Sequence, residues 1–489
     1  MNFSDAAHAI IERMRPSLLA ASLAVATACL AVAAHAATRV GPAEVDAALA
    51  RAKVPPESMV ALVQEVGTTR PRLAWQPDVP VNPASLMKIV TTSAALDLLG
   101  PAWTWSTPVW LQGRVADGVL QGNLVIKGSG DPKLVLERVW LLLRRVQQLG
   151  VREIRGDVVL DRSSFDVPPQ SPAEFDGEPL RPYNARPDAL LLNFRSVVLT
   201  FTPDPASGST RISADPPLAG VQVDPTLPLS ATPCEDWRAA LKAEFGEPAR
   251  LRFAGAFPLA CGEKTWAVAY ADPPTYNARL LAALWAEMGG VLRGTVREGV
   301  APTSAPTFEI VSPSLPEVIR DINKFSNNVM AQQLFLSLGL NLRGLGTPEN
   351  SRAVLRQWLV ERYGVAADAA VIDNGSGLSR DGRLSARLLS LVLEGAWAGP
   401  SMPELISSLP VAGLDGTLRR ARATPGRAHL KTGSLRDVVG VAGYVLGNSG
   451  RRYVVVAIVN HANANAARPA LEALVQWAAN DADAASARR

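Results

Sequence analysis

The sequence has 489 residues, of which 48% are hydrophobic, 19% charged and 6% aromatic. That charged fraction is too low, and that hydrophobic fraction too high, for a disordered chain, and a chain of this length needs no metals or dense disulfides to stabilise its cores. The net charge of +4 is small, and no basic run indicates a nucleic-acid partner. Composition therefore excludes fibrous, disordered and polytopic membrane proteins and leaves a globular protein of about three domains.

Residues 1–36 have the pattern of a secretory signal peptide. Arg13 and Arg15 precede an uncharged stretch at 18–34, and a small-x-small site follows at 34–36. This pattern predicts cleavage after residue 36 and export to the periplasm. A membrane anchor is the alternative, but the alanine-rich stretch is weakly hydrophobic and short for a spanning helix. We therefore expect at most peripheral membrane association.

Export leaves two cysteines, Cys234 and Cys261, in the mature chain. An even pair in an oxidising compartment favours a disulfide, with two buried free thiols as the alternative. The two remaining histidines, His429 and His461, lie in no HExxH pattern, so we expect no metal site built on histidines. No GxSxG elbow, P-loop or GxGxxG is present in the sequence either. If the protein is a hydrolase, we expect its base not to be histidine.

The mature chain is predicted to begin with a helix over 41–54 and a hairpin with strands at 58–66 and 73–75. Asn82 suits the N-cap of the next helix, and Pro83 suits its first position. That helix is predicted to end before Gly100-Pro101, which is a strong stop signal.

Between about 105 and 300 the pattern changes to short strands broken by Gly, Pro and Asp, with one helix at 134–149. Helical patterns resume at 315–340 and 350–363. Residues 433–460 then predict three β-strands. The last of them, Tyr453–Val459, is a continuous apolar run typical of a strand buried on both faces. A closing helix at 468–480 is predicted to cover one face of that sheet.

The first candidate motif is Ser85-Leu86-Met87-Lys88, at the start of a predicted helix. A spacing of three puts the serine hydroxyl and the lysine amine on one helix face, within hydrogen-bond reach. A neutral lysine can take the serine proton if burial and a second cation lower its pKa. Alone the motif is weak, because serine and lysine meet at this spacing by chance.

The second motif is Ser326-Asn327-Asn328, between two helical segments. It offers a hydroxyl to relay a proton and an amide to hold a substrate carbonyl or amide, although a plain helix cap is the commoner explanation of such a triplet.

The third motif is Lys431-Thr432-Gly433, at the start of the β-rich C-terminal block. On an edge strand, Lys431 and Thr432 can bind a substrate carboxylate, and glycine lets a ligand approach the backbone closely. Lys431 can also supply the cation that keeps Lys88 neutral. The alternative is a surface strand that begins with a solvated lysine.

Together and in this order, the three motifs resemble the serine–lysine acyl transferases of the penicillin-binding protein and β-lactamase superfamily. Further segments are similar to the D-alanyl-D-alanine carboxypeptidase/endopeptidase family typified by penicillin-binding protein 4. They are Gly128–Pro132 (GSGDP), Asp373–Arg380 (DNGSGLSR), Leu409–Arg420 (LPVAGLDGTLRR) and Lys431–Val445. Asn327 departs from the commonest pattern, where Asp is frequent, but that position is not catalytic in the family.

The resemblance implies an α+β protein with a β-lactamase/transpeptidase-like catalytic domain, an antiparallel sheet flanked by helices. This domain is expected from 37–108 and 304–489. Residues 109–303 would form inserted β-rich domains, two in number, the inner one at about 135–205. The long separation between the first two motifs favours this family over β-lactamases, which place them closer together.

The resemblance also implies roles for single residues. Ser85 would be the nucleophile and Lys88 its base, Ser326 would pass a proton, and Asn328 would orient the acyl amide. The catalytic set would also include Lys431, while Thr432, Gly433, Ser434, Arg380 and Asp161 would contact substrate. Arg380 and Asp161 are candidates for the diaminopimelate side chain, or else structural ion-pair partners.

The implied partners are peptidoglycan stem peptides, with β-lactams as inhibitors. No metal or other cofactor and no nucleic acid are expected. Two alternatives remain: a related serine β-lactamase or esterase, and a non-catalytic cell-wall binding protein. The long insertion and the SxN motif argue against the first, and the presence of Ser85, Lys88 and Lys431 argues against the second.

Overall fold

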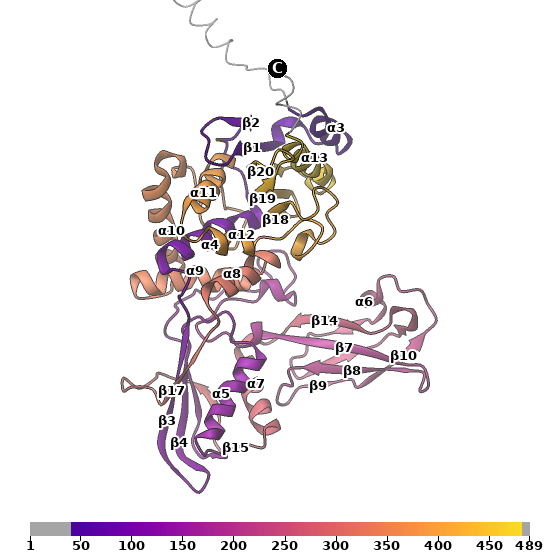
Figure 1. The fold of residues 1–489 in the computed structure, drawn as a ribbon. Coiled ribbons are helices and arrows are strands. Elements are labelled where there is room, and N and C mark those ends of the chain that lie inside the picture. The colour runs from indigo at the N-terminus through magenta and orange to yellow at the C-terminus, as the bar shows by residue number, and fades with distance from the viewer. Residues whose placement is uncertain (1–40, 482–489) are drawn as a thin grey trace, which may run out of the picture. The chain divides into compact units, whose positions relative to one another are not determined.

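A five-stranded antiparallel sheet joins the two ends of the described chain, which covers residues 41–481 in this computed structural model (Figure 1). Its strands, in the spatial order β18-β19-β20-β1-β2, are β1 (Met59–Glu65), β2 (Pro71–Trp75), β18 (Ala428–Leu435), β19 (Val438–Leu446) and β20 (Arg452–Asn460). β1 pairs with β20, where Ala61 lies opposite Ala457. The predicted signal peptide at 1–36 lies outside the described residues.

Both faces of this sheet are buried, which confirms the prediction for its central strand. In β20, Val454 and Val456 belong to one core, and Val455 and Val459 belong to another. Alternation along a strand sends successive side chains to opposite faces, so a continuous apolar run is required here.

Helices cover the two faces of the sheet. The first core contains residues of α4 (Met87–Leu99), α8 (Leu315–Lys324), α9 (Asn328–Arg343), α10 (Pro348–Tyr363), α11 (Ala386–Ala398) and α12 (Met402–Ser408). The second core contains residues of α3 (Ala43–Arg51) and α13 (Arg468–Ala479). Helix α4 is buried at every residue from Met87 to Leu96, so its start is held firmly. The predicted sheet flanked by helices is confirmed.

The chain between the first and second motifs forms further sheets. The first has seven strands: β3 (Ser106–Ala116), β4 (Val119–Lys127), β5 (Glu153–Ile154), β6 (Val158–Asp161), β15 (Val291–Leu292), β16 (Val296–Glu298) and β17 (Phe308–Val311). β3 pairs with β17, so the chain leaves and re-enters this region at neighbouring strands. Two helices pack against these strands, α5 (Leu136–Gln148) and α7 (Pro273–Glu287).

The remaining strands form two smaller sheets. One contains β7 (Ser196–Asp204), β8 (Ser209–Asp215), β10 (Thr226–Ser230), β13 (Phe257–Pro258) and β14 (Lys264–Ala269). The other contains β9 (Gln222–Val223), β11 (Ala243–Glu244) and β12 (Arg250–Phe253), and the short helix α6 (Trp237–Ala240) lies between β10 and β11 in the chain. A disulfide joins Cys234 to Cys261 across this region.

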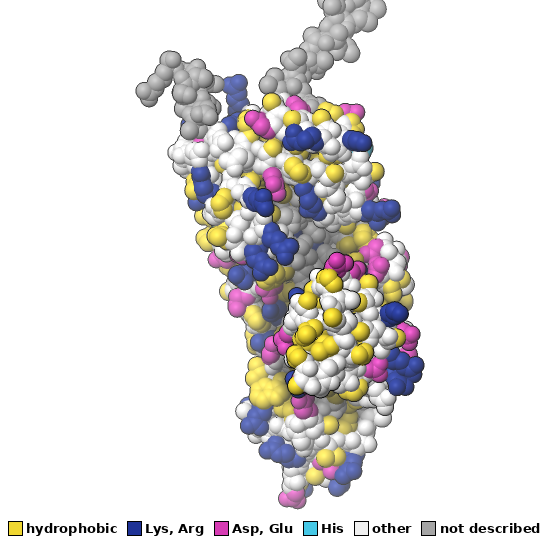
Figure 2. Space-filling model, turned by 90° about the vertical axis from the view of Figure 1, so that its right-hand side faces the viewer, with side chains coloured by type: hydrophobic (Ala, Val, Ile, Leu, Met, Phe, Trp, Pro, Cys, Tyr) yellow, Lys and Arg dark blue, Asp and Glu magenta, His cyan; other side chains and the backbone are white. Residues whose placement is uncertain are grey.

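The structure differs from the sequence-based expectation at α7, which was not predicted. Its buried residues Tyr276, Leu280 and Leu284 recur at helical spacing and complete the core beneath α5 and the sheets. The proposed limits of the inserted domains, 109–303 and about 135–205, stay predictions. On the face shown in Figure 2, Lys and Arg side chains are interspersed with Asp and Glu.

Candidate active site

Ser85 lies in a single turn of 3-10 helix (Ala84–Leu86) that directly precedes α4. Asn82 was expected to cap α4, but α4 begins at Met87, and Asn82 Oδ1 instead accepts a hydrogen bond of 2.9 Å from the Ala84 N–H at the entry to the serine turn. Its side-chain amide also donates to the Ser379 carbonyl at 2.9 Å. Ala84 has a positive φ of 46°, a conformation that a non-glycine residue keeps only where its surroundings enforce it.

Lys88 Nζ lies at the centre of three hydrogen bonds. It is 3.0 Å from Ser85 Oγ, 2.6 Å from Asn328 Oδ1 and 2.5 Å from the Ser376 carbonyl oxygen. The side chain is fully buried. The structure therefore brings together residues of the first and second motifs that are 240 positions apart in the chain.

The Ser376 carbonyl was not among the predicted site residues. It belongs to the DNGSGLSR segment, between Gly375 and Gly377, which have positive φ values of 70° and 76°. A Cβ on Gly377 would lie 1.8 Å from the Ala84 carbonyl oxygen, so this loop can pack against the serine turn only with glycine there. The paired glycines were the sequence signal for this close approach.

Ser326 and Lys431 meet on the other side of the site. Lys431 Nζ is 2.8 Å from Ser326 Oγ and 2.8 Å from the Thr432 carbonyl oxygen. Ser326 itself has a positive φ of 55° and follows Phe325, the C-cap of α8. Asn327 caps α9 through a hydrogen bond from the Met330 N–H, and so fixes the direction in which Asn328 enters the site.

The electrostatics of the site favour neutral lysines. Burial, and secondly the charge of Lys431, hold the pKa of Lys88 well below its ordinary value. Burial lowers the pKa of Lys431 to about 7. Desolvation disfavours the ammonium form, and among residues 41–481 no carboxylate lies within ion-pair distance of either amine to restore it. A lysine in this state can accept a proton at neutral pH.

Gly433 was expected to let a ligand approach the backbone, and the structure shows a second reason for glycine. A Cβ at this position would lie 2.8 Å from the Pro83 carbonyl oxygen. Strand β18 therefore packs directly on the serine turn, and Gly433 keeps Ser85 close to the third motif.

A loop between α12 and β18 connects the second and third motifs, and sequence reasoning assigned it no residue. Asp415 Oδ2 lies 2.6 Å from Nζ of the buried Lys324, two residues before Ser326. Thr417 Oγ1 accepts a hydrogen bond of 2.8 Å from Thr432 Oγ1. The two contacts tie the Ser326 turn to the edge strand, and the DG in the LPVAGLDGTLRR segment was the only signal for this loop.

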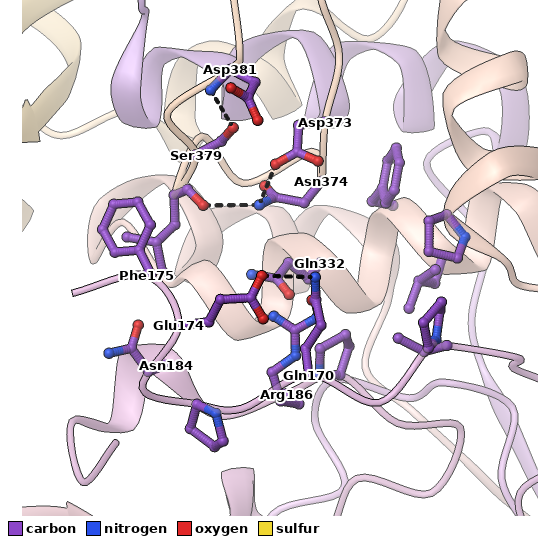
Figure 3. A pocket seen from close by; sticks show the side chains of 18 of the residues that line it. Gln170, Glu174, Phe175, Asn184, Arg186, Gln332, Asp373, Asn374, Ser379 and Asp381 are labelled. Carbon is purple, nitrogen blue, oxygen red and sulfur yellow. Dashed lines mark hydrogen bonds between the residues drawn. The ribbon is translucent and has the colours of Figure 1, made fainter. Parts of the chain in front are cut away.

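A pocket of about 290 Å³ adjoins the site beyond Ser376. Gln332 Nε2 and Asn374 Oδ1 both line this pocket and contact Ser376 Oγ, at 3.4 and 2.8 Å. Figure 3 shows the segment that carries Gln170, Glu174 and Arg186 facing the loop that carries Asp373–Asp381. The lining mixes both charges: it includes Glu174, Asp373 and Asp381 with Arg186, Arg352 and Arg380.

Of the two residues assigned to a substrate side chain, the structure places only Arg380 at this pocket. Its guanidinium lies 4.8 Å from the centre of the Phe175 ring and 3.3 Å from Asp437. Asp161 lies elsewhere, at the end of β6, and is 1% exposed. Its carboxylate accepts hydrogen bonds from the N–H groups of Ser163 and Ala301, so it stabilises the backbone there and is not brought to the site.

Residues 41–481 lack two further features. No group of three His, Cys, Asp or Glu side chains in that range could hold a metal ion. No helix in the same range is long and apolar enough to cross a membrane.

The fold and the buried serine–lysine pair define a class of protein, the serine peptidases with a penicillin-binding-protein fold. The model of the D-Ala-D-Ala carboxypeptidase 3 (S13) family matches residues 42–481, and the chain belongs to that family. The resemblance inferred from the three motifs is therefore confirmed, and the protein is a serine-type carboxypeptidase of this family.

Individual relatives agree with this assignment. The chain is 27% identical over 413 residues to a D-alanyl-D-alanine carboxypeptidase of an Actinomadura species, covering 80% of this chain and 75% of that protein. It is 24% identical over 385 residues to D-alanyl-D-alanine carboxypeptidase DacB of Haemophilus influenzae, covering 77% and 80%. The crystal structure of penicillin binding protein 4 from H. influenzae superposes with a TM-score of 0.70 at 21% identity, covering 90% of this chain and 99% of that one.

Proposed function

We propose that this protein is a periplasmic D,D-carboxypeptidase and endopeptidase of peptidoglycan. It cleaves D-alanyl-D-alanine and D-alanyl-diaminopimelate bonds through an acyl-enzyme on Ser85. The observation that carries this proposal is the buried Lys88 amine, 3.0 Å from Ser85 Oγ and shifted toward its neutral form. The expected periplasmic location rests on the sequence pattern of residues 1–36.

Acylation begins when Ser85 Oγ attacks the carbonyl carbon of the penultimate D-alanine and Lys88 Nζ takes the hydroxyl proton. The carbonyl oxygen becomes an oxyanion, which the backbone N–H groups of Ser85 and Ser434 bind. The Asn328 side chain has two roles. Its Oδ1 holds Lys88 in place, and its amide orients the acyl group.

Ser326 completes the acylation step because its Oγ contacts the second lysine. As the C–N bond breaks, the leaving amine takes a proton from Ser326 Oγ, and the proton that Lys88 took from Ser85 replaces it, which leaves Lys88 neutral again. Water then attacks the ester carbonyl, and Lys88 accepts the water proton and returns it to Ser85 Oγ, which leaves as a hydroxyl. The products are the shortened peptide and a free amine.

The adjoining pocket supports the assignment of a stem-peptide side chain. A residue that carries both an amine and a carboxylate fits a pocket lined by both charges, and Arg380 is the candidate carboxylate ligand. A β-lactam would acylate the same serine and leave slowly. A crystal structure of the H. influenzae relative in complex with a β-lactam, TM-score 0.66, supports this inhibition.

Labelling with a fluorescent penicillin tests the nucleophile. The wild-type protein should be labelled, and Ser85→Ala should not. Ser93→Ala is a matched control on the same helix, because the Ser93 hydroxyl is buried without a hydrogen-bond partner in the structure. Labelling of Ser85→Ala would show that another residue is the nucleophile.

Product analysis tests the reaction. Incubation with a pentapeptide and with cross-linked muropeptides should release D-alanine and separate the cross-links. Lys88→Arg should abolish both reactions, because arginine cannot give up its proton. Rapid nitrocefin turnover without peptide products would instead identify a β-lactamase, and labelling without any product would identify a binding protein.

A further inference from the structure

The third motif offers no accessible cation to bind the terminal carboxylate of the substrate. Lys431 was the expected partner, yet its amine is fully buried and binds Ser326 Oγ and the Thr432 carbonyl oxygen. Its pKa of about 7 also leaves the amine only partly charged at neutral pH. A substrate carboxylate on the exposed edge of β18 therefore needs charge from another residue.

Arg468, the first residue of α13, lies beside that edge. Its Nη2 is 2.9 Å from Ser434 Oγ and 2.9 Å from Asn465 Oδ1. Arg468 is exposed, and among residues 41–481 it has no carboxylate within ion-pair distance. The guanidinium is thus held next to the site, and no carboxylate among residues 41–481 neutralises its charge.

The geometry of β18 places the hydroxyls of Thr432 and Ser434 on the side of the sheet where Arg468 lies. Thr432 and Ser434 are two residues apart in β18, so both side chains lie on one face of the sheet. Leu430 shares that face and packs in the core that contains Leu471 of α13. The two hydroxyls and the guanidinium therefore converge from β18 and from α13.

We propose that Arg468 binds the C-terminal carboxylate of the substrate, together with the hydroxyls of Thr432 and Ser434. This inference rests on the proposed function and names its carboxylate-selecting residue. A guanidinium remains charged at every relevant pH and matches a carboxylate through two parallel N–H donors. Its hydrogen bonds to Ser434 and Asn465 orient it before substrate arrives, which reduces the entropy lost on binding.

Two peptides that differ in one group test this role. The first is an N-acylated tripeptide that ends in D-Ala-D-Ala, and the second is the same peptide with a C-terminal carboxamide. The wild-type enzyme should prefer the free acid. In Arg468→Met, kcat/KM for the free acid should fall by about 10- to 100-fold, the effect of a lost charge-assisted hydrogen bond. For the carboxamide it should change by less than about twofold, because an uncharged terminus gains little from the cation.

Arg436→Met is the matched control. Arg436 is an exposed arginine in the turn between β18 and β19, so its loss changes the net charge equally near the same strand. Arg436→Met should leave kcat/KM unchanged for both peptides. Arg468→Lys should retain part of the preference for the free acid.

Three outcomes would overturn the inference. An equal fall on both peptides would give Arg468 a structural role only, and an unchanged kcat/KM for both peptides would leave it without any role in binding. A wild-type enzyme that hydrolyses neither peptide and is not labelled by penicillin would overturn the proposed function as well.

Discussion

The charge of Lys431 lowers the pKa of Lys88, although the two residues are in different motifs. Both side chains are fully buried, and burial is the largest cause of each shift. Each lysine contacts one serine hydroxyl, Lys88 that of Ser85 and Lys431 that of Ser326. The pair thus supplies two hydroxyls with neighbouring amines of perturbed basicity, and its titration should control the acylation step.

We predict that the rate of acylation by benzylpenicillin rises with pH across the acidic and neutral range and levels off well below the ordinary lysine pKa of 10.5. In Lys431→Met this rise should move to higher pH, because removal of the Lys431 charge raises the pKa of Lys88. The plateau rate should also fall, since Ser326 loses its partner. Stopped-flow acylation measured from pH 5 to 10 provides the test, and an unchanged midpoint would show that the two amines are not coupled.

Loss of the Lys431 amine should lower activity but raise stability. The folded-state pKa of Lys431, about 7, lies below its unfolded value near 10.5. Between these two values the unfolded chain binds more protons, so this residue makes the wild-type protein more stable as pH rises from about 7 to 10.5 and costs stability below that window. One pKa unit corresponds to about 1.4 kcal/mol, which sets an upper limit of about 5 kcal/mol for this cost.

Lys431→Met should therefore raise the free energy of unfolding by about 1–3 kcal/mol at pH 6, after subtraction of the lost hydrogen bonds. The gain should shrink at pH 9, where the wild-type lysine is neutral. Urea unfolding at the two pH values measures the difference. A variant that is less stable than wild type at pH 6 would contradict this account.

The local signals were sufficient to predict the main elements and the three motifs. The apolar run of β20, the Gly100-Pro101 stop after α4 and the serine–lysine spacing each depend on neighbours in the sequence. By contrast, the contacts of the Ser376 carbonyl and of Asp415 join segments that only the tertiary fold brings together. No periodicity or spacing encodes such contacts, so sequence reasoning could not assign them.

Two residues show how packing acts on a residue type that the sequence makes plain. Asn82 is a residue type that suits a helix N-cap, but its hydrogen bonds to the distant Ser379 and to Ala84 place it at the entry to the serine turn, ahead of α4. The substrate contact predicted for Asp161 stays a prediction, while its carboxylate accepts hydrogen bonds from the N–H groups of Ser163 and Ala301 at the end of β6. Sequence identifies the residue type, and the packed neighbours decide its role.

The ion pair between Lys324 and Asp415 should position Ser326. Lys324 has only 5% of its side chain exposed, whereas 38% of the Asp415 side chain is exposed. Asp415→Asn should slow acylation and cost about 1–2 kcal/mol of stability, the lower part of the range for an unpaired charge because water reaches the site.

The double variant Lys324→Met/Asp415→Asn should regain the stability but not the acylation rate, since no unpaired charge remains while Ser326 is still unanchored. Urea unfolding and penicillin acylation are measured for Asp415→Asn, for Lys324→Met and for the double variant, which with the wild type form a double-mutant cycle. Additive losses of stability would mean that the pair does not interact.

Gly433 offers the sharpest test of how the third motif holds the nucleophile. In Gly433→Ala the new Cβ would meet the Pro83 carbonyl oxygen at 2.8 Å, as well as Leu86 and Ala84 at 3.2 and 3.4 Å. The serine turn must shift, and a displacement of about 1 Å at a reacting group lowers rates by about 100-fold. We expect a loss of that size in acylation with unchanged secondary structure by circular dichroism. Gly246→Ala, where a Cβ meets nothing within 4 Å, should acylate like the wild type. A Gly433→Ala enzyme with the wild-type rate would show that the edge strand and the serine turn move independently.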